Sequence, residues 1–176
     1  STFGKRLIEQ PLMKNVLADL ALESTAATTM MLRLARAYDE AERDPAARSF
    51  VRIATAVTKY YICKRCPAMG YEALECHGGN GYVDDTMIAR IYREMPLGSV
   101  WEGTGNVMCL DVLRAMAREP ETIPALQTEL ASAAGRNKDY DRYIATLADD
   151  LRDTATLEVR ARRVVERLAV ALQEVL

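Results

Sequence analysis

The chain has 176 residues, of which 49% are hydrophobic and 27% charged, a composition that excludes a disordered protein and allows one domain with a real core. Its 23 basic and 25 acidic residues give a net charge of −2, so no overall field draws it to nucleic acid or to an anionic membrane. It has neither an apolar stretch long enough to span a bilayer nor a signal-peptide core. We therefore expect a cytoplasmic protein with no membrane partner and with reduced cysteines. Its first residues read like the interior of a longer protein.

The N-terminal half predicts two long antiparallel helices. Glycine and proline are few and clustered, and β-branched runs with period-two alternation are missing, which favours an all-α fold. The first helix covers about residues 11–43, and Asp44 followed by Pro45 provides the N-cap and first turn of the second. Pro67 lacks the N–H that a helix interior needs, so we expect a kink or restart there before the helix continues over residues 68–76.

Two irregular passages rich in glycine follow. The stretch HGGNGYVDD predicts a turn before a short helical segment at residues 86–92, and the second passage covers residues 95–103. Thr104 or Asn106 can then cap another helix. These elements predict an up-and-down four-helix bundle over residues 1–118.

The C-terminal part predicts a separate helical unit. Residues 119–176 form an extra C-terminal helical subdomain packed on the bundle, with helices at about residues 121–134, 139–152 and 154–175.

The glycine-rich passages are the places where this sequence could hold a ligand. Gly78, Gly79 and Gly81 would let a backbone lie against a ligand, and residues 103–106 present free N–H groups at a helix start. Taken alone, such glycines are better explained as turn and helix-ending residues.

Three linked motifs resemble the acyl-CoA dehydrogenase family. HGGNGY and WEGTGN occur in the family's order and at its separation, and the start TFGKRLIEQPL resembles the family's FG-x-x-L segment. The resemblance covers about residues 2–117 and implies the family's C-terminal helical domain. The AidB-like branch is the nearest one, because Trp101 precedes the motif's Glu, NVMCLDVLR follows it, and Glu75 replaces the usual Gln.

The resemblance implies a catalytic role for Glu102 as the general base that removes the α-proton of an acyl-CoA thioester, while FAD accepts the β-hydride. Burial would raise the pKa of such a base, and Trp101 and Gly103 would lie beside the substrate. A Glu that only complements the helix dipole is the alternative. We expect the two glycine-rich turns to fold side by side.

The family also shares each flavin site across a homo-dimer or homo-tetramer. By resemblance, Thr104 and Asn106 contact the flavin of one subunit, and the chain by itself binds FAD poorly. Six residues are expected to contact the flavin of a neighbouring subunit: Thr2, Phe3, Gln10, Glu75, Gly78 and Gly79.

Several other interpretations of the sequence stay open. A helical, AidB-like flavin-containing module that binds or protects DNA, with weak or lost dehydrogenation, is the main alternative, and a helical scaffold without a cofactor is a third. A DNA-binding patch would use Arg160, Arg162, Arg163 and Arg167, but the tail carries more acidic than basic residues, which favours a solvated face. Cys63, Cys66, Cys76 and His77 lack the spacing of a zinc site, so we expect no metal.

Overall fold

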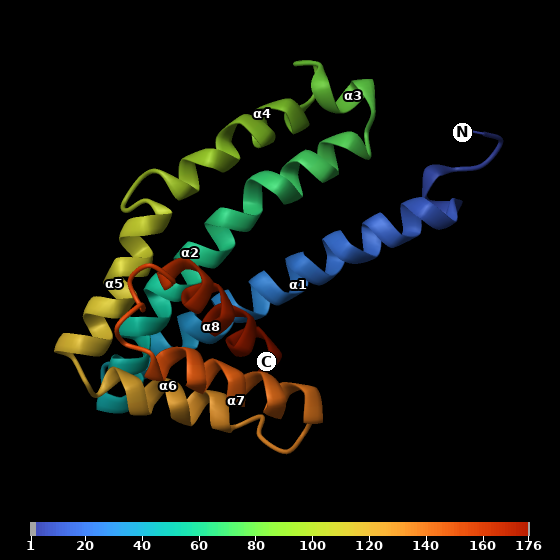
Figure 1. Ribbon diagram of the computed structural model, residues 1–176. Helices are drawn as coiled ribbons and strands as arrows, with labels where there is room; N and C mark the ends of the chain where they lie inside the picture. The colour runs from blue at the N-terminus through green and yellow to red at the C-terminus, as the bar shows by residue number, and fades with distance from the viewer. Residues whose placement is uncertain (1–2, 176) are drawn as a thin grey trace.

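A computed structural model describes residues 3–175, and the helices predicted from the sequence account for most of it (Figure 1). No strand occurs in that described range, which confirms the all-α prediction. The elements are η1 (Leu7–Glu9), α1 (Pro11–Glu40), α2 (Pro45–Glu75), α3 (Gly79–Tyr82), α4 (Met87–Glu94), η2 (Met95–Ser99), α5 (Gly105–Arg118), α6 (Thr122–Ala131), α7 (Lys138–Arg152) and α8 (Ala161–Val175).

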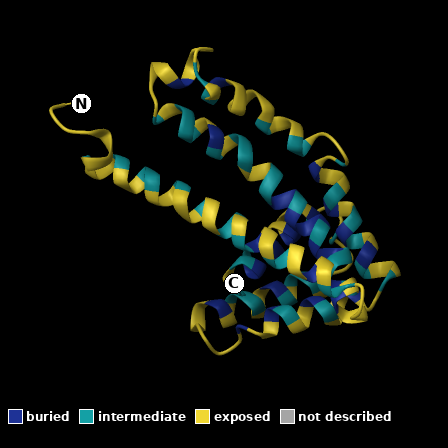
Figure 2. Ribbon diagram, turned by 180° about the vertical axis from the view of Figure 1, so that it is seen from behind, coloured by how far each residue is buried: buried dark blue, intermediate teal, exposed yellow. Residues whose placement is uncertain are grey.

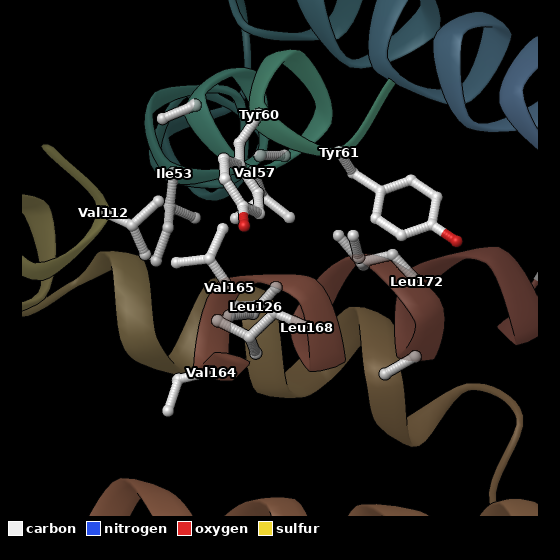
Figure 3. Packing of buried hydrophobic residues seen from close by; sticks show 14 of the residues in the cluster. Ile53, Val57, Tyr60, Tyr61, Val112, Leu126, Val164, Val165, Leu168 and Leu172 are labelled. Atoms are coloured by element: carbon white, nitrogen blue, oxygen red, sulfur yellow. The ribbon is translucent and has the colours of Figure 1, made fainter. Parts of the chain in front are cut away.

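Helix α2 is the central element, because α1, α4, α5, α6 and α8 all pack against it. Figure 3 shows Ile53 and Val57 of α2 meeting Val112 of α5 and Val165 of α8. These four side chains are fully buried, and each contributes roughly 1.5–3 kcal/mol by leaving water. One cluster of buried side chains therefore extends from the predicted bundle into the C-terminal helices. The expected division into two domains after residue 118 stays a prediction.

The α1–α2 hairpin forms as the sequence predicts. The Asp44 carboxylate accepts a hydrogen bond from Ala46 N at 2.8 Å, which caps α2, and Pro45 fills its first turn. Helix α1 ends at Glu40, three residues earlier than expected. Figure 2 shows that the far part of α1 is mostly exposed and that of α2 mostly intermediate, whereas burial concentrates where α2 meets α5 and α8.

Pro67 does not restart α2, which runs unbroken through it. A proline at this position cannot donate to the carbonyl of Cys63, four residues earlier. Ser99 Oγ donates to that carbonyl at 2.6 Å instead. Gly98 also lies close to the same turn, because a Cβ added there would be 3.2 Å from Cys63 Sγ. The missing backbone bond thus marks the place where η2 docks on α2.

The last predicted helix is shorter than expected, because residues 153–160 form turns and α8 begins at Ala161. Thr156 Oγ1 donates to Asp153 at 2.6 Å, and Arg160 donates to the carbonyl oxygens of Asp150 and Asp153 at 3.1 and 2.8 Å. Side chains that bond to nearby backbone groups compete with helix formation. Helix α7 begins at Lys138, one residue before the predicted start, and the Asn137 side chain caps it by accepting from Asp139 N at 2.8 Å.

Candidate functional site

The loop that carries Glu102 joins η2 to α5 and has an unusual backbone. Glu102 has φ +52°, in the left-handed region that L residues rarely adopt, and Gly103 follows with φ +111°. The positive φ of Gly103 favours glycine there, and a Cβ added to it would displace the end of the Met108 side chain, whose Cε would be 2.4 Å away. Phe3 is the other non-glycine residue with positive φ in the described chain. Both Glu102 and Phe3 were predicted from the sequence as site residues, and strained residues tend to cluster at functional sites.

Lys59, near the middle of α2, holds this loop. Its ammonium donates to the carbonyl of Trp101 at 2.6 Å and to that of Gly103 at 2.7 Å, which lie on either side of Glu102. Lys59 was not among the site residues predicted from the sequence. The one feature that could have pointed to Lys59 is its place between Thr58 and Tyr60, which are both buried. No sequence motif surrounds this lysine.

Glu102 lines a cavity of ≈ 520 Å³ between α1, α2 and α5, together with Tyr38, Lys59, Met108 and Asp111. Its side chain is nevertheless exposed. The buried environment expected for this carboxylate is therefore not formed by the chain's own residues, because the loop lies at the surface. Glu102 does border a cavity, as a base that meets a substrate must.

The cations near Glu102 are engaged elsewhere. Arg52 pairs with Asp111 and with Glu119, each at 2.9 Å, and Arg48 donates to the Ala41 carbonyl. Among residues 3–175, no cation lies within ion-pair distance of the Glu102 carboxylate. The carboxylate is thus not neutralised by a neighbouring side chain.

The start of α5 follows directly. Thr104 is its N-cap residue, with φ −65° and ψ 165°, but its side chain makes no capping hydrogen bond. Asn106 is exposed in the first turn. Gly105 is buried against α2, where a Cβ would be 2.8 Å from Lys64 Cε. The Thr104 and Asn106 side chains are therefore exposed at the start of α5, where the first N–H groups have no partner within the helix.

The other glycine-rich turn ends α2. Gly78 has φ +57° and nothing lies within 4 Å of a Cβ added to it, and the same space surrounds Gly79. A Cβ on Gly81 would be 2.3 Å from the Leu74 carbonyl oxygen, so Gly81 has a packing role. Glu75 is exposed and accepts a hydrogen bond from Tyr71 Oη at 3.3 Å.

The expectation that the two glycine-rich turns fold side by side is wrong. Lys59 contacts the Glu102 loop, whereas Leu74 contacts Gly81, and 15 helical residues correspond to about 22 Å along α2. Helix α4 and η2, which connect the turns, run back along α2 and keep them apart (Figure 1).

The end of the molecule that carries Gly78 also carries the start of α1 (Figure 1). Phe3 is exposed there, and Gln10 is the N-cap residue of α1. The residues expected to contact a neighbouring subunit's flavin therefore gather at one end, while Glu102, Thr104 and Asn106 lie elsewhere. Thr2, predicted with the first group, lies outside the described residues.

The cysteines do not assemble with His77. His77 Nδ1 lies 2.9 Å from the Ala73 carbonyl, within its own helical turn. Burial raises the pKa of the thiols of Cys63 and Cys66, which favours their neutral form. Across residues 3–175, no three His, Cys, Asp or Glu side chains come together as metal ligands.

The tail arginines converge on Asp150. Arg167 and Arg160 both pair with its carboxylate, the latter at 3.3 Å, and Arg163 lies 3.6 Å from it. The hydrogen bond from Arg167 holds the pKa of Asp150 below its ordinary value. Three of the four arginines named for the DNA-binding patch, Arg160, Arg163 and Arg167, thus lie against one carboxylate of α7.

Comparison with known proteins identifies the family. The family model for the acyl-CoA dehydrogenase C-terminal domain matches residues 1–117. The chain belongs to this family. AidB of Escherichia coli (strain K12) is 40% identical over 153 residues, covering 87% of this chain and 28% of AidB. The chain thus spans less than a third of that acyl-CoA dehydrogenase relative. The Caenorhabditis elegans acyl-CoA dehydrogenase family member 11 is 29% identical over 81% of this chain and 24% of its own length.

Solved structures agree with this assignment. The apo-form of Bd2924 matches with a TM-score of 0.89 and 28% identity, over 99% of this chain and 35% of that one. The Caenorhabditis elegans ACDH-11 structure, in complex with C11-CoA, shares the fold with a TM-score of 0.82 and 22% identity, over 98% of this chain and 33% of its own. The resemblance to the acyl-CoA dehydrogenase family and to its AidB-like branch is confirmed. In the described range, no helix meets the length and apolarity of a membrane span.

Proposed function

We propose that this chain supplies the catalytic base of an FAD-dependent acyl-CoA dehydrogenase. The observation that carries the proposal is the Glu102 loop. Among the described residues no ion pair neutralises its carboxylate, and the loop borders a cavity, in a left-handed backbone conformation directly before α5. A non-glycine residue in the left-handed region costs free energy, and such residues are found mostly at functional sites, where the surrounding structure enforces the conformation.

An acyl-CoA thioester is the proposed substrate. The fold neighbour ACDH-11 holds C11-CoA, which supports this ligand class. Glu102 would take the α-proton of the thioester, and the electron pair of the broken C–H bond would form the new double bond as the β-hydride leaves. By the family resemblance Gly103 would lie beside the substrate, and the exposed indole of Trp101 offers an apolar surface at the same loop.

The residues of the chain fit an FAD group in two separate places. Gly78 and Gly79 leave space that a Cβ would fill, and the Thr104 hydroxyl is not used as a cap. FAD, when bound, accepts the β-hydride. Because the two places are about 22 Å apart along α2, they suit contacts to two different flavins. Thr104 and Asn106 would hold one, and Phe3, Gln10, Glu75, Gly78 and Gly79 would contact that of a neighbouring subunit.

This arrangement requires a homo-oligomer. Exposed apolar side chains support one, because the far part of the hairpin and α4 present Leu12, Leu22 and Met87, each at least 70% exposed. Burying these side chains in a subunit interface would be favourable, because apolar area removed from water stabilises an association. A homo-dimer or homo-tetramer would cover this surface and complete the shared flavin contacts.

The test uses the protein expressed from its complete coding sequence and loaded with FAD. Anaerobic addition of an acyl-CoA series should bleach the flavin absorbance. Glu102→Gln should retain FAD and lose bleaching by at least about 100-fold, because a carboxamide cannot take the proton. Glu158→Gln, an exposed glutamate in the tail, is the matched control and should behave as the wild type. Equal bleaching by Glu102→Gln would refute the assignment of the base.

A further inference from the structure

Two carbonyl groups flank the proposed base, and one ammonium binds both. Lys59 Nζ lies 2.6 Å from Trp101 O and 2.7 Å from Gly103 O. Both distances are short for hydrogen bonds from nitrogen, as expected when the donor is charged. The lysine side chain is half-buried and spans the gap between the middle of α2 and the loop.

The loop needs such a constraint. Trp101 N donates to Leu97 O at 3.1 Å before the turn, and Met108 N donates to Thr104 O at 2.9 Å after it. Between these bonds stand two consecutive residues with positive φ, Glu102 and Gly103. A non-glycine residue persists in the left-handed region only when its surroundings over-determine it. The two bonds from Lys59 fall on the residues directly before and after Glu102.

The choice of partners by Lys59 is informative. Carboxylates of Glu102 and Asp111 line the same cavity as Lys59, yet its ammonium donates to two backbone carbonyls. Arg52 satisfies Asp111, so Lys59 is not needed there. The cation thus fixes the backbone of the loop while leaving the Glu102 carboxylate unpaired, which is what a base that must accept a proton requires.

We propose that Lys59 is a positioning residue that holds the Glu102 loop in the conformation in which Glu102 lines the cavity. The inference rests on the proposed function for its catalytic consequence, but the contact itself can be tested without any flavin. Trp101 is the single tryptophan of the chain and one of the two residues whose carbonyl Lys59 binds, so its fluorescence reports on the loop directly.

The test compares Lys59→Met and Lys59→Arg with the wild type. Lys138→Met, the same change at an exposed position on α7, is the control. Far-UV circular dichroism checks that each variant is folded. Lys59→Met should lower the fluorescence anisotropy of Trp101 and speed its quenching by acrylamide, because the loop is released. Lys59→Arg, which keeps a charged donor, should restore much of the wild-type signal, and Lys138→Met should match the wild type.

In the flavin-loaded protein, Lys59→Met should lower kcat about 10- to 100-fold with KM nearly unchanged, as expected for a misplaced catalytic group. Lys59→Arg should recover part of kcat. A folded Lys59→Met with wild-type anisotropy and wild-type kcat would overturn the inference and leave the proposed function standing. If the wild type fails to bleach with any acyl-CoA, the proposed function is wrong, and the Trp101 anisotropy alone then decides whether Lys59 holds the loop.

Discussion

Replacing Ser99 by alanine tests how α2 tolerates a proline in its interior. The Pro67 ring leaves the Cys63 carbonyl without its helical partner, and Ser99 Oγ donates to it at 2.6 Å. Ser99→Ala removes this donor and leaves the acceptor partly buried beneath η2. We expect the docking of η2 on α2, and therefore the stability of the chain, to depend on this one hydroxyl.

The size of the effect follows from the burial of the pair. Leaving a buried acceptor without a partner costs about 1–3 kcal/mol. Ser99 and Cys63 are both half-buried, so water can replace part of the lost bond. We therefore expect Ser99→Ala to lower the free energy of unfolding by about 1–2 kcal/mol.

Urea unfolding followed by circular dichroism at 222 nm measures this loss of stability. The same substitution made in a Pro67→Ala variant makes the test specific to the missing helical bond. Pro67→Ala restores the backbone N–H that can donate to Cys63, so Ser99→Ala should cost only about 0–0.5 kcal/mol in that background. The coupling between the two positions should be about 1 kcal/mol. Equal costs of Ser99→Ala in both backgrounds would show that the hydroxyl does not replace the missing helical bond.

Two further changes test other parts of the fold. Gly81→Ala should destabilise the chain by about 1–3 kcal/mol in thermal or urea unfolding, because its Cβ would be 2.3 Å from the Leu74 carbonyl oxygen; Gly79→Ala, with space around it, should not. Asp150→Asn should destabilise the α7–α8 pair in a pH-dependent way. Arg167 lowers the pKa of Asp150, so its stabilising effect is present above the unfolded pKa and is lost as pH falls through the folded value. The stability difference between wild type and Asp150→Asn should be constant well above the ordinary pKa of an aspartate and should shrink as the pH falls below it; a difference that does not change with pH would contradict this account.

The sequence by itself determined most of the helices and the place of the candidate base. Local signals were sufficient there: Asp44 and Pro45 start α2, and the glycines around residues 78 and 103 interrupt helices. Capping and left-handed conformations depend on neighbours a few residues away, so they can be read from a short window. The WEGTGN motif pointed to Glu102 in the same way.

Only the tertiary structure decided what joins these pieces. Lys59 and Trp101 are 42 residues apart, and Ser99 and Cys63 are 36 residues apart, so neither contact has a local signal. The continuity of α2 through Pro67 and the separation of the two glycine-rich turns both follow from how α4 and η2 pack along α2. A backbone carbonyl can accept a hydrogen bond from any donor that packing brings within reach, which is why the chain's own pattern did not reveal the lysine that holds the Glu102 loop.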